Sequence, residues 1–281
     1  MGSKKRKVDI VVLSDIHLGT YGSHARELLV YLKSIKPKTV ILNGDIVDIW
    51  QFSKRYWPKS HMKIVRQIIG WAGKGIKTYY ITGNHDEMLR KFDGFKIGSL
   101  EIVNKLVLNL NGEKTWFFHG DVFDVIMQHS KWLARLGAMG YDALILLNNL
   151  INKINELFGR GKVSLSKRIK ENVKSAVRYI NNFEETAARL ALRKGCKNIV
   201  CGHIHHAEIR NIEISNQSVR YLNSGDWVES LTALEYHKKK WKIFRYSEEM
   251  KPEEGEDEQM KWLADYGTKE LFRKMLDEFQ N

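Results

Sequence analysis

The sequence predicts an α/β fold in which parallel strands alternate with helices. Three short apolar runs, at residues 8–13, 39–42 and 77–81, are followed directly by polar residues, as buried parallel strands are. The segments between them, residues 25–35 and 62–72, carry apolar side chains at helical spacing. Strands and helices that alternate in this way place a site at the carboxyl ends of the strands.

The remaining elements follow from turn signals and apolar runs. Pro37 is predicted to close the first helix. Residues 102–110 and 115–118 resemble the two strands of a hairpin whose turn is Asn111-Gly112. Residues 198–201 are predicted to form another strand, and short strands continue to Tyr246.

The composition predicts one substantial folded domain and no export. Of the 281 residues, 43% are hydrophobic and 28% charged, which is ordinary for a folded soluble protein. We find no secretory signal and no apolar run of about 18 residues, the length a membrane-spanning helix needs. Cys196 and Cys201 lack the spacing of a zinc site and fit a reducing, cytoplasmic location. The net charge of +13 favours polyanionic partners without choosing among them.

An insertion interrupts the second half of the chain. His119 and His203 are 84 positions apart, whereas the earlier motif residues are 28 to 39 positions apart. Residues 122–192 have helical periodicity and many basic side chains, and we interpret them as a cap over the active site; a helical layer on the back of a sheet is the alternative. The predicted domain therefore comprises residues 1–246, cap included. Residues 247–281 are predicted to be an acidic linker and an amphipathic helix.

Five short polar motifs carry the predicted chemistry. They are Asp15-x-His17, Gly44-Asp45-x-x-Asp48, Gly83-Asn84-His85-Asp86, His119-Gly120-Asp121 and Gly202-His203-x-His205. Together they supply carboxylate, amide and imidazole groups, a mixture suited to two divalent cations. A late segment, Asn223 to Trp227, is expected to support this site without binding metal.

In this order the motifs resemble those of the calcineurin-like metallophosphoesterase superfamily, over residues 8–246. The resemblance implies a four-layer αββα sandwich and two divalent metal ions that share Asp45. It implies the following ligands: Asp15, His17, Asp45 and His205 for the first ion, and Asp45, Asn84, His119 and His203 for the second. Two adjacent cations lower the pKa of a bridging water and bind the phosphoryl oxygens during in-line attack.

His85 and Asp48 are the predicted catalytic pair. His85 follows a predicted metal ligand, so its side chain can face the substrate and donate a proton to a phosphoryl or leaving-group oxygen. Asp48 is predicted to orient His85, and a loop cap is the alternative role for this carboxylate. Five other histidines are interpreted as core or surface residues: His24, His61, His129, His206 and His237.

Within the superfamily, residues 14–18, residues 44–50 and the insertion resemble the UDP-2,3-diacylglucosamine pyrophosphatases of bacterial lipid A synthesis. That resemblance implies hydrolysis of the UDP-linked lipid to UMP and 2,3-diacylglucosamine 1-phosphate, usually with manganese. Asn84, His85, Lys167 and Lys170 are the predicted substrate-binding residues, and contact with an anionic membrane, peripheral to the inner membrane, is a further hypothesis. The sequence departs from that family at His85, where an arginine is typical.

Two other functions stay open at this point. The basic surface favours a nuclease or another phosphodiesterase of the same superfamily. A non-catalytic scaffold that keeps only the fold is the third interpretation. The complete set of predicted ligands argues against it. Ligands of these types bind manganese, iron or zinc, so they do not identify the metal.

Overall fold

The computed structural model describes residues 5–49, 56–123, 180–247 and 250. Its strands are β1 (Arg6–Leu13), β2 (Ile35–Asn43), β3 (Lys77–Ile81), β4 (Lys96–Ile97), β5 (Leu100–Val103), β6 (Leu106–Leu110), β7 (Glu113–Phe117), β8 (Asn198–Cys201), β9 (Glu208–Ile214), β10 (Gln217–Asn223), β11 (Thr232–His237) and β12 (Lys240–Arg245). Its helices are α1 (Ala25–Ser34), α2 (Lys59–Gly73), the 3₁₀ turns η1 (Glu87–Phe92) and η2 (Asp121–Phe123), and a helix at residues 180–193.

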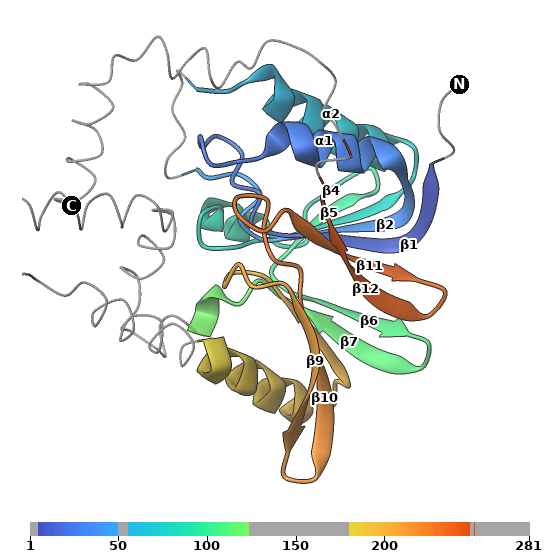
Figure 1. Cartoon of the computed structure of the whole chain (residues 1–281), viewed down its shortest axis with the longest axis vertical. Coiled ribbons are helices and arrows are strands. Elements are labelled where there is room, and N and C mark those ends of the chain that lie inside the picture. The colour runs from blue at the N-terminus through green and yellow to red at the C-terminus, as the bar shows by residue number, and fades with distance from the viewer. Residues whose placement is uncertain (1–4, 50–55, 124–179, 248–249, 251–281) are drawn as a thin grey trace, which may run out of the picture.

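Two β-sheets form the two central layers of the molecule (Figure 1). The first sheet has the strand order β12-β11-β1-β2-β3-β5-β4, and the second has the order β6-β7-β8-β10-β9. Helices α1 and α2 cover the outer face of the first sheet, and the helix at 180–193 covers the outer face of the second (Figure 1). The predicted αββα sandwich is therefore confirmed.

Parallel pairing directs the site to one edge of each sheet. In the first sheet β1, β2, β3 and β5 are parallel neighbours, and in the second β8 is parallel to β7 and β10. The carboxyl ends of parallel strands lie at the same edge of a sheet. Loops that follow these strands can therefore meet, although their residues are far apart in the sequence.

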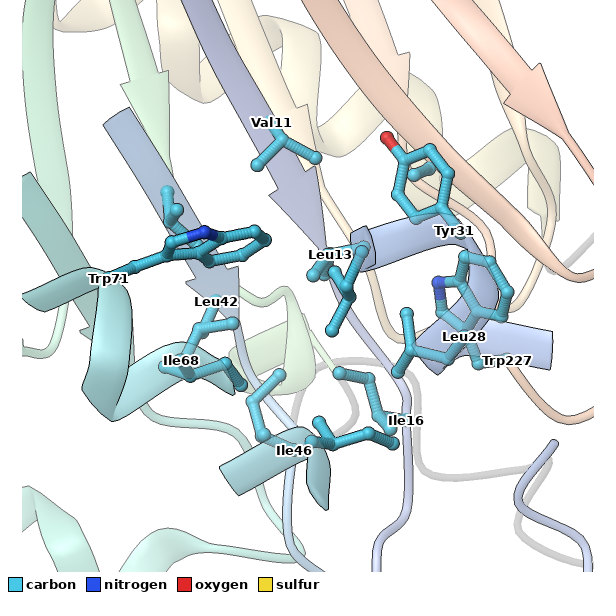
Figure 2. Close-up of a cluster of buried hydrophobic side chains, with 14 of the residues drawn as sticks. Val11, Leu13, Ile16, Leu28, Tyr31, Leu42, Ile46, Ile68, Trp71 and Trp227 are labelled. Atoms are coloured by element: carbon cyan, nitrogen blue, oxygen red, sulfur yellow. The ribbon is translucent and has the colours of Figure 1, made fainter. Parts of the chain in front are cut away.

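Three apolar layers hold the sandwich together. Figure 2 shows the first, in which Leu13, Leu28, Trp71 and Trp227 pack between the first sheet and its helices. A second layer between the sheets includes the fully buried Phe117 together with side chains of β1, β8, β10 and β11. The third layer joins the helix at 180–193 to the second sheet.

Two boundaries differ from the sequence-based prediction. α1 ends at Ser34, and Pro37 lies within β2. Pro37 is tolerated there because β2 pairs only with β1 at this level; its pairing with β3 begins at Thr39. The predicted strand at 102–110 is in fact two strands, β5 in the first sheet and β6 in the second. The predicted hairpin turn is present between β6 and β7, and Asn111 and Gly112 both have positive φ.

Part of the predicted cap and tail lies outside the described residues. Residues 180–193 are helical and pack on the second sheet through Phe183, Ala187, Ala188 and Ala191. Residues 124–179, with Lys167 and Lys170, and residues 251–281 are not described. In the part of the chain that is described, no helix is long and apolar enough to cross a membrane.

Replacement of Phe117 by alanine should destabilise the protein by about 3 to 5 kcal/mol, because it leaves a cavity between the sheets. Chemical denaturation measures this change. Val107→Ala on the neighbouring strand β6 is the matched control; Val107 is 52% exposed, so its loss should cost no more than about 0.5 kcal/mol. Equal midpoints for the two variants would contradict the packing described here.

Candidate metal centre

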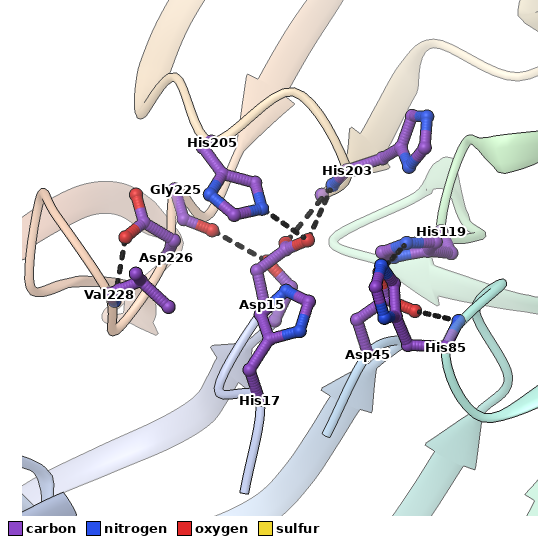
Figure 3. A network of polar contacts seen from close by, with 12 residues as sticks. Asp15, His17, Asp45, His85, His119, His203, His205, Gly225, Asp226 and Val228 are labelled. Atoms are coloured by element: carbon purple, nitrogen blue, oxygen red, sulfur yellow. Dashed lines mark hydrogen bonds and ion pairs between the residues drawn. The ribbon is translucent and has the colours of Figure 1, made fainter. Parts of the chain in front are cut away.

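Residues from five separate loops converge at the carboxyl ends of the strands. Figure 3 shows Asp15 and Asp45 at the centre, with histidine side chains around them. The loops after β1, β2 and β3 come from the first sheet, and those after β7 and β8 come from the second. The sandwich therefore joins carboxylates from one sheet to imidazoles from the other.

The backbone at this edge is strained. Five predicted ligands have positive φ, a region that non-glycine residues rarely adopt: Asp15 (51°), His17 (51°), Asp45 (54°), His203 (71°) and His205 (54°). Each such residue costs on the order of 1 kcal/mol and is kept where the surrounding structure enforces it. Strain of this kind is concentrated at functional sites.

Three clusters of side chains have ligand atoms within 4.8 Å of one another. They are Asp15 with His17 and His205, Asp45 with His119 and His203, and His17 with Asp48 and His85. The first two clusters bring together residues that the sequence assigned to the first and the second ion. Their roles as ligands stay a prediction.

Asp15 is buried and surrounded by positive or hydrogen-bonding groups. Its carboxylate accepts the backbone N–H of His203 and lies 3.3 Å from Nε2 of His205. Burial alone would raise the pKa of Asp15, but the charges of His205 and His119 lower it to about 2. Burial lowers the pKa of His205, and the Asp15 carboxylate outweighs this and raises it to about 9.

Asp45 is held between two segments of the site. Its Oδ1 accepts the backbone N–H of His85 at 2.9 Å, and its Oδ2 lies 3.1 Å from Nε2 of His119. His119 donates its Nδ1–H to the carbonyl of Asn43, so its Nε2 is directed at Asp45. Burial opposes the charged form of both groups. The His119 imidazole nevertheless keeps the pKa of Asp45 below its ordinary value, and the carboxylates of Asp45 and Asp15 keep the pKa of His119 well above its ordinary value.

The donor set fits divalent cations. His17 Nε2 and Asn84 Oδ1 are buried and have no hydrogen-bond partner among the described residues. A buried acceptor without a partner is costly, and a coordinated cation would satisfy it. Because metal ligands must be deprotonated, binding would release protons from histidines whose pKa the carboxylates have raised.

Two motif glycines make room for this arrangement. A Cβ on Gly44 would overlap the His119 ring, and Gly44 has a φ of 85°. A Cβ on Gly83 would overlap the carboxylate of Asp45. The glycines therefore allow close approach of side chains from different loops.

Asp48 makes the predicted contact with His85 and a second one that was not predicted. The buried Oδ2 of Asp48 lies 2.8 Å from Nδ1 of His85 and 3.3 Å from Nδ1 of His17. Burial lowers the pKa of His85, but the hydrogen bond to Asp48 reverses this and raises it above the ordinary value. Asp48 thus joins a predicted ligand to the predicted acid.

Sequence reasoning gave no role to Asp86, the last residue of its motif. Its buried carboxylate accepts hydrogen bonds from the backbone N–H of Ile46, the backbone N–H of Gly83 and the hydroxyl of Tyr80. The only signal in the sequence for a role of Asp86 was its position directly after His85. Ile46, which donates one of these hydrogen bonds, is 40 positions away.

The late segment from Asn223 to Trp227 supports the site, as expected. Trp227 donates its backbone N–H to the carbonyl of Asp15, and Ser14 donates its hydroxyl to the carbonyl of Gly225. Asp226 accepts backbone N–H groups from the turn that follows it.

Of the other histidines, those that the structure describes belong to neither of the first two clusters. His61 is buried, whereas His24 and His237 contact Glu27 and Asp9 near the surface. His206 is exposed, and His129 lies outside the described residues.

Residues 8–207 match the family model described as calcineurin-like phosphoesterase, and the chain belongs to this family. A protein of Aliivibrio fischeri named UDP-2,3-diacylglucosamine hydrolase is 23% identical over 255 residues, which cover 83% of this chain and 99% of that protein. One of the same name from Actinobacillus succinogenes is 26% identical over 235 residues, covering 79% and 93%. The chain is accordingly a metal-dependent hydrolase, and its family implies divalent metal ions.

Solved structures with a similar chain path include an archaeal phosphodiesterase and the Vacuolar Protein Sorting 29 protein of Cryptosporidium parvum. The first has 13% sequence identity and a TM-score of 0.38, covering 84% of this chain and 98% of that one. The second has 14% identity and a TM-score of 0.36, covering 84% and 96%.

His61 should make the stability of the protein depend on pH. It accepts the backbone N–H of Gly19, and burial lowers its pKa from 6.5 to about 4. Because the unfolded chain binds this proton more readily, the contribution is complete above pH 6.5 and is lost as the pH falls towards 4. The loss is about 3 kcal/mol.

Urea denaturation between pH 4 and pH 7.5 tests this dependence. His61→Gln is the control, since its amide oxygen can accept the same N–H group but does not titrate. The free energy of unfolding of the variant should fall less steeply with acidification. Parallel curves would show that His61 does not titrate as described.

Proposed function

We propose that the chain is a phosphoester or pyrophosphate hydrolase that uses two divalent metal ions sharing Asp45. The observation that carries the proposal is the convergence of two clusters of candidate ligands, from both sheets, around buried acceptors that have no hydrogen-bond partner among the described residues. In this assignment Asp15, His17 and His205 complete the first site. Asn84, His119 and His203 complete the second.

When bound, the ions supply Lewis acidity and activate a water for attack on phosphorus. Proton transfer is assigned to protein residues. Asn84 and His85 lie on the same loop, so His85 stands where it can donate a proton to a phosphoryl or leaving-group oxygen. Asp48 Oδ2 lies 2.8 Å from Nδ1 of His85 and favours the protonated form of the imidazole, so Nε2 is the nitrogen that we propose for proton donation.

The substrate that we propose is UDP-2,3-diacylglucosamine, cleaved to UMP and 2,3-diacylglucosamine 1-phosphate in lipid A synthesis. The names of the relatives support this assignment. So does a group of exposed apolar side chains that follow His85 in the sequence. It consists of four side chains that are 44% to 63% exposed: Met88, Phe92, Phe95 and Ile97. Such side chains suit acyl chains or a lipid boundary.

We further propose a cytoplasmic protein in peripheral contact with the inner membrane and supplied with Mn²⁺, with Fe²⁺ or Zn²⁺ as alternatives. Lys91, whose Nζ lies over the ring of Phe92, suits an anionic membrane. Lys167 and Lys170 are proposed to bind the diphosphate of the substrate.

A nucleic-acid phosphodiesterase is the second candidate. A groove of about 520 Å³ at the edge of the sandwich supports it, because its lining includes Arg210, Arg220, Lys239 and Lys240 and no acidic residue. This groove lies towards the amino-terminal end of β8, away from the metal centre, since Arg220 pairs in register with Asn198. The basic side chains of the groove would bind the phosphates of a polyanion there, at a distance from the proposed metals.

A phosphorus NMR assay separates these candidates. With Mn²⁺ present, UDP-2,3-diacylglucosamine should be converted to UMP and the acylated sugar phosphate. UDP-glucose and single-stranded DNA, assayed in parallel, should react at least about tenfold more slowly. Cleavage of DNA without turnover of the lipid would favour the second candidate. Absence of all three reactions and of metal binding would favour a non-catalytic scaffold.

Two histidine variants test the division of roles. His119→Ala should weaken the second metal and lower the turnover of bis-p-nitrophenyl phosphate by at least about a hundredfold. His85→Ala should keep both metals and lower kcat by about a hundredfold, as expected for loss of a general acid. Metal analysis of the purified variants accompanies the kinetics. Unchanged activity of His119→Ala, or loss of both metals from His85→Ala, would contradict the assignment.

A further inference from the structure

The loops of the candidate metal centre are held together in two different ways. The loop after β1 is joined to the loop after β2 by main-chain hydrogen bonds. They run from Asp15 N to Gly44 O, from Ile16 N and His17 N to Asp45 O, and from Leu18 N to Ile46 O. Such bonds do not depend on the identity of any side chain.

The loop after β3, which carries Asn84, is attached differently. A main-chain bond joins Ile49 N to His85 O, but the contacts nearest Asp45 are made by carboxylates. Asp86 Oδ2 accepts the N–H of Ile46 at 2.9 Å, and Asp86 Oδ1 accepts the N–H of Gly83 at 2.6 Å. One side chain therefore spans the residue after Asp45 and the residue before Asn84.

The loops that carry His119 and His203, the other predicted ligands of the second ion, are attached by bonds that do not involve Asp86. His119 is fixed through its ring to the carbonyl of Asn43, and its own carbonyl accepts the N–H of Gly202. His203 donates its N–H to Asp15. Among the predicted ligands of the second ion, Asn84 is thus the one whose loop is tied to the loop of Asp45 through Asp86, in addition to the bond from the N–H of His85 to Asp45.

We infer that Asp86 is a positioning residue that holds Asn84 at coordinating distance from Asp45 and so maintains the second metal site selectively. The inference rests on the proposed metal ligands. Asp86 has 0% exposure, so its carboxylate acts through these hydrogen bonds and does not reach substrate.

Asp86→Asn is the direct test. The amide keeps the size of the side chain, but one oxygen acceptor becomes an NH₂ donor, which must then face a backbone N–H or the Tyr80 hydroxyl. Equilibrium dialysis against Mn²⁺ with elemental analysis should show two ions for the wild type. For the variant, the affinity of one ion should fall by at least about tenfold while the other is retained.

Kinetics with bis-p-nitrophenyl phosphate should change in the same direction. kcat should fall at low Mn²⁺ and recover as Mn²⁺ is raised, with KM within about threefold of the wild type. A purely structural role would lower thermal stability without changing the dependence on metal.

Tyr80→Phe is the matched control. It removes the hydroxyl donor from the same carboxylate oxygen and leaves both backbone contacts of Asp86 in place. Both metal affinities should stay within about threefold of the wild type even if the melting temperature falls. Should Asp86→Asn not fold, Asp86→Ser is measured with the same expectation, because a serine hydroxyl is too short to bridge both loops.

The outcomes separate the inference from the proposed function. Two ions with wild-type affinity in Asp86→Asn, or equal loss of the second ion in Tyr80→Phe, would overturn the positioning role alone. A wild-type protein that binds at most one ion would overturn the proposed metal pair, and the inference with it.

Discussion

Two buried carboxylates, Asp15 and Asp45, constrain the rest of this structure. Neither is more than 2% exposed, and a buried charge is strongly destabilising unless it is paired and hydrogen-bonded. The surrounding loops meet this requirement with backbone N–H groups and with imidazoles. The same negative potential that raises the pKa of His119 and His205 would hold divalent cations.

Neither sheet can form this centre alone. The first sheet contributes both carboxylates and Asn84, whereas the second contributes His119, His203 and His205. The apolar layer between the sheets therefore contributes to the distances between the predicted ligands as well as to the stability of the domain. A cavity in that layer would change the geometry of the candidate metal centre, since protein interiors are close-packed and transmit strain.

The strain in the backbone is compensated locally. Three predicted ligands with positive φ, Asp15, His17 and Asp45, lie next to main-chain hydrogen bonds that join the loops after β1 and β2. The segment from Asn223 to Trp227 adds further bonds to the first of these loops. A rigid surround of this kind keeps the side chains in place before any ion binds, which reduces the cost of ordering them on binding.

The sequence by itself determined the strand and helix order at the amino terminus, the hairpin turn at Asn111-Gly112 and the residues that meet in the first two side-chain clusters. These features depend on local patterns and on motifs a few residues long. The tertiary structure alone decided that the chain changes sheets between β5 and β6, that Pro37 fits within β2, that Asp48 also contacts His17, and that Asp86 joins two loops. Those outcomes depend on pairing and hydrogen bonds between residues up to 40 positions apart, and local periodicity carries no information about such distant partners.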